Sequence, residues 1–259
     1  MAFAQLKIFS ESLRMATEVN VVIPQRSTSG EIGTNNKEER GKYKCLYLLH
    51  GLSDDQTIWM RRTSIERYAT EYGIAVVMPR GERSFYTDMK YGQKYYTYVS
   101  EELPKIICDL FPISDKREDN IIGGLSMGGY GALKIALNNT DRYAKAIALS
   151  SVADIRALYE RFNDTLDLVF GGKENVRDED DIFTLADTNK DNPEKPEIYM
   201  AVGLSDFMYE ENVRLRDHFK KAGYDLTYKE GPGIHGWGFW DEYIKYALEW
   251  AYGTSHNHR

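Results

Sequence analysis

A serine stands in a glycine-rich turn between an apolar run and a helix-forming run. The turn reads Gly124-Leu125-Ser126-Met127-Gly128, within the stretch NIIGGLSMGGYGAL that starts at Asn120. A G-x-S-x-G pattern between a strand and a helix is typical of a nucleophile elbow, which exposes the serine hydroxyl. Gly124 and Gly128 have a steric reason to be glycine, because a side chain beside so sharp a turn would clash. The pattern indicates nucleophilic attack by Ser126 on an acyl carbonyl.

Such an attack requires an imidazole that takes the serine proton and a carboxylate that orients the imidazole. His235 follows the last predicted strand in a Gly-Pro-Gly loop, and Asp206 follows the predicted strand at 197–202. The order Ser126, Asp206, His235 is one in which serine hydrolases carry their catalytic triad. We therefore expect Ser126 as nucleophile, Asp206 as acid and His235 as base.

These assignments have alternatives. Asp206 also fits a helix N-cap before Tyr209, and His235 also fits a turn histidine that packs on a neighbouring tryptophan. Asp180 and Asp181 are rival acids, although their acidic cluster reads more simply as a solvated face.

The reaction also needs backbone amides that bind the oxyanion of the transition state. Met127, directly after the nucleophile, is expected to supply one amide, and Leu52, in the loop after the strand at 43–49, the other. His50 precedes that loop and fits either a catalytic role or a supporting hydrogen bond. Aromatic residues near these segments fit either a pocket wall or the core: Trp59, Phe85, Tyr86, Trp237 and Trp240. Of these, Trp59 and Trp237 are the favoured substrate-binding residues.

The elements that must position these residues alternate between strands and helices. Two strands at 4–13 and 17–23 are expected to pair as an antiparallel edge, and further strands are predicted at 43–49, 75–78, 144–149, 197–202 and 226–229. Helices are predicted at 63–71 (opened by a capping box), 96–110 (kinked by Pro104), 130–137, 209–222 and 239–252. Residues 153–192 read as a helical insertion over the strand ends. Residues 25–42 are predicted to be a solvated loop and 253–259 a frayed tail.

This alternation predicts an α/β fold with a mostly parallel sheet and helices on both faces, in one domain over 1–259. The net charge of −7 argues against nucleic acid or an anionic membrane as a partner. Cys45 and Cys108 are expected to be buried thiols, and no Cys/His spacing predicts a metal site. Without a signal-peptide pattern or a membrane-length apolar run, a cytoplasmic location is expected.

Four blocks of the chain carry a resemblance: LLHGLSDDQTIW, GLSMGGYGALKIAL, GLSDFMYEEN and GIHGWGFWDEYI. Together, over residues 1–252, they resemble the esterase D-type branch of the α/β-hydrolases. That group includes tributyrin-esterase-like carboxylesterases, S-formylglutathione hydrolases, feruloyl and acetylxylan esterases, and mycolyltransferases. The resemblance implies an α/β-hydrolase fold, the triad named above and oxyanion amides from Leu52 and Met127. S-formylglutathione hydrolases typically carry a cysteine after their HGL, where this chain has Ser53-Asp54.

The resemblance implies a serine carboxylesterase that cleaves short-chain acyl or hydroxycinnamoyl esters through an acyl-enzyme on Ser126. The expected substrate is a small-molecule ester, with plant polysaccharides as one source, and no cofactor or metal is required. A homodimer is an open alternative to a monomer. Two other activities stay open, a thioesterase like S-formylglutathione hydrolase and an acyltransferase with an alcohol acceptor. A non-catalytic binding protein is disfavoured because all three triad residue types are present in order.

Overall fold

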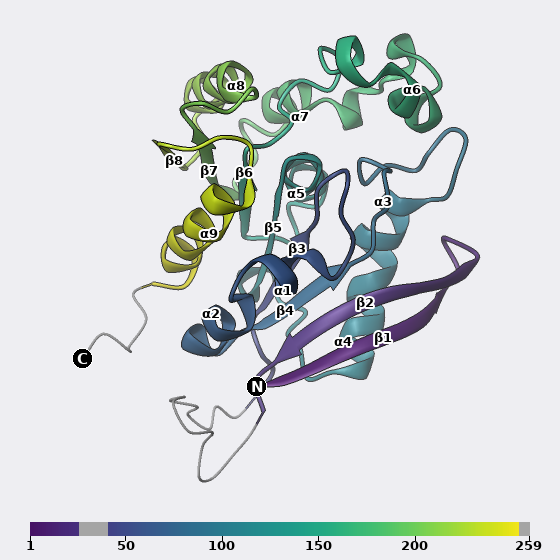
Figure 1. The fold of residues 1–259 in the computed structure, drawn as a ribbon, viewed down its shortest axis with the longest axis vertical. Coiled ribbons are helices and arrows are strands. Elements are labelled where there is room, and N and C mark those ends of the chain that lie inside the picture. Colours follow the sequence, from purple (N-terminus) through teal and green to yellow (C-terminus); the bar gives the residue numbers. More distant parts are fainter. Residues whose placement is uncertain (26–40, 254–259) are drawn as a thin grey trace.

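The computed structural model describes residues 1–25 and 41–253. The loop predicted at 25–42 and the tail predicted at 253–259 lie almost entirely outside these ranges. An eight-stranded sheet runs through the described part, with strand order β1-β2-β4-β3-β5-β6-β7-β8 (Figure 1). The strands are β1 (Ala2–Ser10), β2 (Met15–Ile23), β3 (Cys45–Leu49), β4 (Ala75–Pro79), β5 (Asn120–Leu125), β6 (Lys145–Leu149), β7 (Glu197–Gly203) and β8 (Leu226–Gly231).

The α-helices are α1 (Ile58–Arg62), α2 (Ile65–Tyr72), α3 (Tyr95–Thr97), α4 (Leu103–Leu110), α5 (Met127–Asn138), α6 (Tyr159–Phe170), α7 (Ile182–Thr188), α8 (Tyr209–Lys221) and α9 (Trp237–Tyr252). A π-helical turn precedes α4, and 3-10 turns occupy Arg117–Asp119, Lys173–Asn175 and Asp178–Asp180.

The directions in which the strands pair agree with the prediction. β1 pairs with β2 and β2 with β4 in antiparallel fashion, whereas every pair from β4 through β8 is parallel. The mostly parallel sheet with an antiparallel N-terminal edge is therefore confirmed. Because parallel strands end at one edge of a sheet, the turns after β5, β7 and β8 lie along the same edge.

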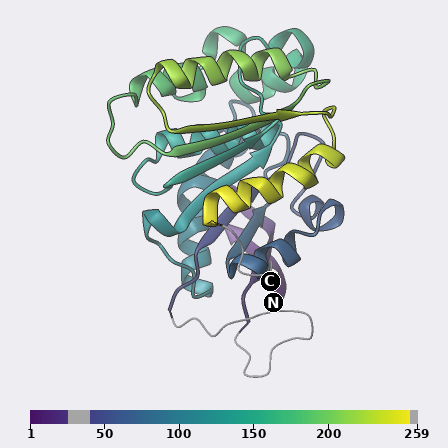
Figure 2. The ribbon, with the colours of Figure 1, turned by 90° about the vertical axis from the view of Figure 1, so that its left-hand side faces the viewer.

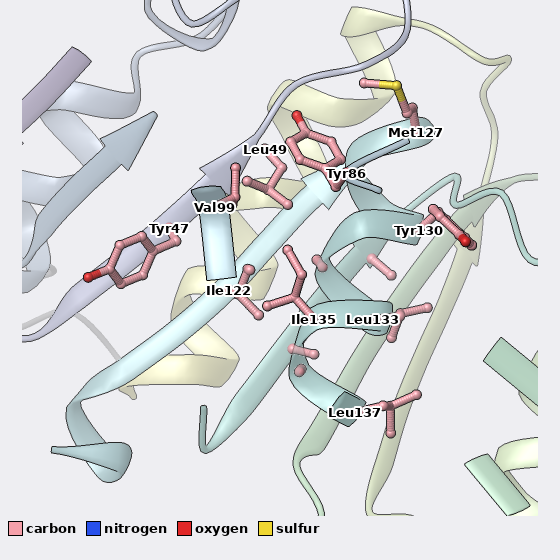
Figure 3. Packing of buried hydrophobic residues seen from close by; sticks show 14 of the residues in the cluster. Tyr47, Leu49, Tyr86, Val99, Ile122, Met127, Tyr130, Leu133, Ile135 and Leu137 are labelled. Atoms are coloured by element: carbon pink, nitrogen blue, oxygen red, sulfur yellow. The ribbon is translucent and has the colours of Figure 1, made fainter. Parts of the chain in front are cut away.

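Helices cover both faces of the sheet. Figure 2 shows α8 and α9 on opposite sides of β7 and β8. Alternate side chains of β3 enter two separate hydrophobic cores, one on each face of the sheet. The core on the face of α4 and α5 takes Cys45, Tyr47 and Leu49. The core on the face of α1 and α9 takes Leu46 and Leu48. Side chains of β3, β5 and α5 meet in the first of these cores (Figure 3). Burial on both faces explains the unbroken apolar run of β3.

Three local predictions are refined by the structure. The predicted helix at 96–110 is interrupted, as expected, but by a π-helical turn at Tyr98–Glu102 that ends just before Pro104. The capping box at 63–66 is wrong in detail, because Ser64 is the N-cap of α2 and makes no side-chain capping bond. The hydroxyl of Thr63 accepts from the Ile65 amide instead. Helix α1 was not predicted.

Residues 153–192 are helical, as predicted, and contain α6 and α7. Cys45 is buried, whereas Cys108 is only half-buried. Across residues 1–25 and 41–253, every helix is too short or too polar to cross a membrane.

Candidate active site

Ser126 occupies a strained turn between β5 and α5. Its backbone has φ 51° and ψ −118°, a region that residues with a side chain rarely adopt. A Cβ on Gly124 would strike the backbone of Gly128, and a Cβ on Gly128 would strike the carbonyl group of Leu49. Both glycines are thus required by close backbone contacts, as predicted. The turn holds the serine side chain at the carboxyl edge of the sheet, directly before α5 begins.

Three predicted residues from distant parts of the chain meet in a line of hydrogen bonds. Nε2 of His235 lies 3.0 Å from Oγ of Ser126. Nδ1 of the same ring lies 3.0 Å from each carboxylate oxygen of Asp206. With Nδ1 protonated, the ring donates to Asp206 and leaves Nε2 free to accept the serine proton.

Two neighbouring loops bring Asp206 and His235 together. The amide of Leu204 donates to the carbonyl of Gly231 at 2.8 Å, and that of Ser205 donates to Gly233 at 2.9 Å. A Cβ on Gly203, at the end of β7, would strike the carbonyl of Gly233. The loops after β7 and β8 therefore pack backbone against backbone, which sets the separation of the carboxylate and the imidazole.

Asp206 is buried and kept ionised by its partners. Burial alone raises the pKa of its carboxyl, but hydrogen bonds from His235 and from the amide of Met208 outweigh it and hold the pKa below the ordinary value. The Met208 amide donates to Oδ1 at 2.8 Å. This Asx turn replaces the alternative N-cap role, because the N-cap of α8 is Met208 itself. Asp206 thus serves the turn and the imidazole together.

The His235 ring is packed as well as hydrogen-bonded. It lies 4.9 Å from the ring of Trp240 at an interplanar angle of 89°, and 4.5 Å from the ring of Phe207. The indole Nε1 of Trp240 donates to Ser150 at 3.0 Å. His235 therefore packs on a tryptophan, as the alternative expected, and also bonds to Ser126 and Asp206. The packing limits rotation of the imidazole ring.

His50 is a buried, neutral support for the loop after β3. Nε2 accepts from the amide of Gly81 at 2.9 Å, so Nδ1 carries the proton and donates to the carbonyl of Gly51 at 2.8 Å. Burial lowers the pKa of this imidazole. His50 is 1% exposed and both ring nitrogens bind backbone groups, which favours the supporting role over the catalytic one.

The same bond orients a backbone amide. In a trans peptide the carbonyl and the following N–H point in opposite directions, so fixing the Gly51 carbonyl also fixes the N–H of Leu52. Within the described residues, neither this amide nor that of Met127 has a hydrogen-bond acceptor. Both are therefore free to bind a ligand oxygen.

A cavity of about 470 Å³ opens beside Ser126 and His235. Its wall is mostly apolar, and Leu52, Met127 and Trp237 line it, as does Phe85. Trp59 is not part of this wall. It is buried, its Nε1 donates to the carbonyl of Leu49 at 3.1 Å, and its ring stands edge-on to Trp237. Trp59 supports a lining residue instead of lining the cavity.

Other parts of the wall come from residues that we did not single out. Leu158 and Phe162 reach the cavity from the insertion, and Phe207 and Met208 reach it from the turn before α8. A kink at Phe162, with φ −135° and ψ 34°, interrupts the helical backbone there. No pattern in the sequence indicates this kink. Phe207 and Met208, in contrast, directly follow Asp206, and this position could have identified them as cavity residues.

The rival acids have other partners. Asp181 caps α7 by accepting from the amides of Phe183 and Thr184 and also pairs with Arg156. Asp180 is buried and pairs with Lys134 and Arg177. The prediction that this cluster is a solvated face is therefore wrong for Asp180. Within residues 1–25 and 41–253, no three histidine, cysteine or carboxylate side chains gather as metal ligands would.

Comparisons with known proteins identify the family of the chain. The family model named Esterase matches residues 10–250. An acetyl esterase of Caldicellulosiruptor saccharolyticus is 34% identical over 263 residues, covering 96% of this chain and 98% of that protein. The substrate-bound structure of the fluorophosphonate-binding serine hydrolase F of Staphylococcus aureus is 35% identical with a TM-score of 0.88, covering 98% of this chain and 99% of that one.

An S-formylglutathione hydrolase from Staphylococcus aureus is also similar, at 35% identity and a TM-score of 0.85. The match covers 96% of this chain and 98% of that one. The chain therefore belongs to the Esterase family, in the esterase D-type branch of the α/β-hydrolases, and is a carboxylic ester hydrolase.

Proposed function

We propose that the protein is a serine carboxylesterase that hydrolyses short-chain acyl esters through an acyl-enzyme on Ser126. The observation that carries the proposal is the line of 3.0 Å contacts from Ser126 through His235 to Asp206. A serine hydroxyl is a poor nucleophile by itself, and this arrangement supplies the base and the group that orients the base.

In the first half of the reaction, Oγ of Ser126 attacks the ester carbonyl while its proton passes to Nε2 of His235. The carbonyl oxygen becomes an oxyanion, which the N–H groups of Leu52 and Met127 bind. Collapse of this intermediate breaks the bond to the alcohol oxygen, and the imidazolium of His235 gives its proton to that oxygen. The alcohol leaves and the acyl group stays on Ser126.

The second half repeats these steps with water. His235 takes a proton from the water molecule as its oxygen attacks the acyl carbon, and then returns that proton to Oγ of Ser126. Asp206 remains ionised throughout and stabilises the imidazolium, consistent with the lowered pKa of its carboxyl. The products are a carboxylic acid and the restored serine.

The acyl group that we favour is short. A cavity of about 470 Å³ with Phe85, Leu158 and Phe162 in its wall suits a small apolar acyl group. The likeness to an acetyl esterase at 34% identity supports acetyl as the first candidate. Hydroxycinnamoyl esters, including feruloyl esters from plant polysaccharides, are the larger candidates for the same cavity.

A panel of p-nitrophenyl esters from acetyl to long chains, with methyl ferulate and acetylated xylan, tests this proposal. We expect kcat/KM to be highest for acetyl or another short chain. A preference for long chains, or an absence of hydrolysis with every ester, would contradict the proposed substrate class.

A thioester substrate is the second candidate, because an S-formylglutathione hydrolase is 35% identical to this chain. The loop after β3 carries Ser53-Asp54 where we expect a cysteine in that group. Comparing kcat/KM for S-formylglutathione and for p-nitrophenyl acetate decides between the two. Adding an alcohol and looking for a new ester among the products tests the acyltransferase alternative.

A further inference from the structure

A buried ion pair, Lys134 with Asp180, contacts the cavity-wall residue Phe85, and the proposed reaction does not use it. Nζ of Lys134 is 3.2 Å from Oδ1 of Asp180, with side-chain exposures of 0% and 3%. A lysine charge in such a place is costly unless every proton of its ammonium group is bound. The pair therefore needs an explanation beyond that of a surface salt bridge.

The ammonium group binds two segments to α5. Besides Asp180, Nζ donates to the carbonyl of Phe85 at 3.3 Å and to the hydroxyl of Thr87 at 2.5 Å. These three acceptors use all three protons of the ammonium group. Lys134 thus holds the loop at 80–94 on one side and the insertion on the other.

The bond to Phe85 falls on a strained peptide. Phe85 has φ 51° and Tyr86 has φ 48°, so two bulky residues in a row are left-handed. The carbonyl that Lys134 binds belongs to the peptide joining these two residues. Such a turn persists only where its surroundings hold it, and Lys134 provides a contact at its centre.

The strained Phe85–Tyr86 turn also holds the loop after β3 in place. The hydroxyl of Tyr86 donates to the carbonyl of His50 at 3.0 Å, and the amide of Gly81 donates to the His50 ring. The ring of Tyr86 packs directly on Gly131 of α5, where an added Cβ would clash. His50 then fixes the Gly51 carbonyl and with it the Leu52 amide.

Asp180 is anchored to the same helix by a second contact. Tyr130, one helical turn before Lys134, donates its hydroxyl to the backbone carbonyl of Asp180 at 2.6 Å. Nε of Arg177 donates to Oδ2 of Asp180 at 2.8 Å. The helix that begins directly after Ser126 therefore anchors both the loop at 80–94 and the insertion.

We propose that Lys134, held by Asp180, is a positioning residue that fixes the Phe85–Tyr86 turn and, through His50, the Leu52 amide that binds the oxyanion. This inference rests on the proposed function. It assigns Lys134 no contact with substrate. Its effect falls on transition-state binding, because the groups that it positions meet charge that develops during the reaction.

The test compares Lys134→Met with the unaltered protein, using p-nitrophenyl acetate and an alkylboronic acid. The boronic acid forms a tetrahedral adduct with Ser126 and so reports on the oxyanion site. Rates are expressed per active site titrated with a fluorophosphonate, which removes any effect of misfolded protein. We expect kcat to fall by about tenfold or more, and boronate affinity by a similar factor, with little change in KM.

Lys145→Met is the matched control. Lys145 also forms an ion pair, 3.0 Å from Glu197, and lies over the ring of Trp250. It has no contact with the loop at 80–94 among the described residues, so its loss should leave kcat and boronate affinity unchanged. If Lys134→Met matches Lys145→Met in both quantities and differs only in melting temperature, Lys134 is merely structural and the inference is wrong.

Thr87→Val serves if Lys134→Met does not fold. It removes the hydroxyl that accepts from Lys134 and donates to the Phe85 carbonyl, at nearly constant volume. We expect the same paired losses in smaller measure, and recovery in Thr87→Ser, which restores the hydroxyl. Unaltered values in Thr87→Val would overturn the inference. An unaltered protein that hydrolyses no ester would instead overturn the proposed function.

Discussion

The two halves of the cavity are held in place by different means. The catalytic edge, formed by the turns after β5, β7 and β8, is fixed by backbone contacts, such as those of Gly124 with Gly128 and of Gly203 with Gly233. The part of the pocket wall that comes from residues 80–94 and 153–192 is fixed by side chains, including the ion pair of Lys134 with Asp180. Changes at the edge should therefore affect the reaction directly. Changes in the wall should affect substrate choice, stability and, through the Leu52 amide, binding of the transition state.

Replacing Ser126 by alanine should cause the largest loss of activity of any change at the catalytic edge. Loss of the nucleophile should lower kcat by about 10⁶-fold, because the remaining triad members cannot act without it. The melting temperature should change little, since the side chain shrinks by one oxygen. Steady-state kinetics and circular dichroism measure the two quantities, and retained activity in a folded variant would remove Ser126 from its role.

Asp206→Asn should lower kcat by about 10⁴-fold, because the amide cannot hold the imidazole in the required tautomer. Asp181→Asn is the control, since it keeps an oxygen to cap α7 and lies outside the triad. We expect kcat of the control to stay near that of the unaltered protein. The reverse pattern, with Asp181→Asn inactive and Asp206→Asn active, would show that the wrong acid was chosen.

His50 connects the edge with the wall. His50→Leu removes the bonds to Gly51 and Gly81, and should lower kcat by about 10²-fold through a displaced Leu52 amide. His50→Asn should lose less, because its amide nitrogen can take the place of Nδ1 and still donate to Gly51. Equal losses in the two variants would show that the bond to the Gly51 carbonyl has no special role.

Phe162→Ala should change substrate choice more than rate. Its side chain lines the cavity, so its removal should raise kcat/KM for longer acyl chains relative to acetyl by about tenfold. Phe183→Ala, in the same insertion but packed on His218, is the control. The measurement is the dependence of kcat/KM on acyl chain length with p-nitrophenyl esters. If both variants gave the same dependence, Phe162 would not be a wall residue that selects the acyl chain.

The smallest expected effect concerns stability against acid. Burial raises the pKa of the Asp180 carboxyl, but Lys134 and Arg177 outweigh it and hold the pKa below 3.8, its ordinary value. The folded protein then binds this proton less tightly than the unfolded chain. The stabilisation is complete above the unfolded pKa and is lost as the pH falls through the lower folded pKa.

Melting temperatures between about pH 5 and pH 2 measure this contribution, because the range spans the ordinary carboxyl pKa. Over that range the melting temperature of the unaltered protein should fall more steeply than that of Asp180→Asn, which has no proton to gain there. Parallel curves would show that Asp180 does not contribute to acid sensitivity.

The same contrast explains what the sequence could predict. The sheet, the elbow and the meeting of Ser126, Asp206 and His235 follow from where strands end, since parallel strands bring their ends to one edge. The kink at Phe162 and the burial of Asp180 depend on contacts between segments far apart in the chain. Asp180 in particular lies in an acidic run whose composition indicates solvent exposure, and its pairing with Lys134 and Arg177 reverses that expectation.

Trp59 shows the same limit within a well-predicted loop. Its place near Leu52 in the sequence suggested a pocket residue, yet its indole is buried on the face of α1 and α9. Position along the chain indicated the correct segment of the structure, but not that Trp59 packs behind Trp237, which lines the cavity instead.

The central claim, an acyl-enzyme on Ser126, is tested most directly by rapid acid quenching of the protein during turnover of p-nitrophenyl acetate. Peptide mass spectrometry then locates any bound acetyl group. We predict a burst of one p-nitrophenolate per active site and an acetyl group on the peptide that contains Ser126, and neither in Ser126→Ala. Hydrolysis without a burst and with no acetyl group on Ser126 would contradict the account.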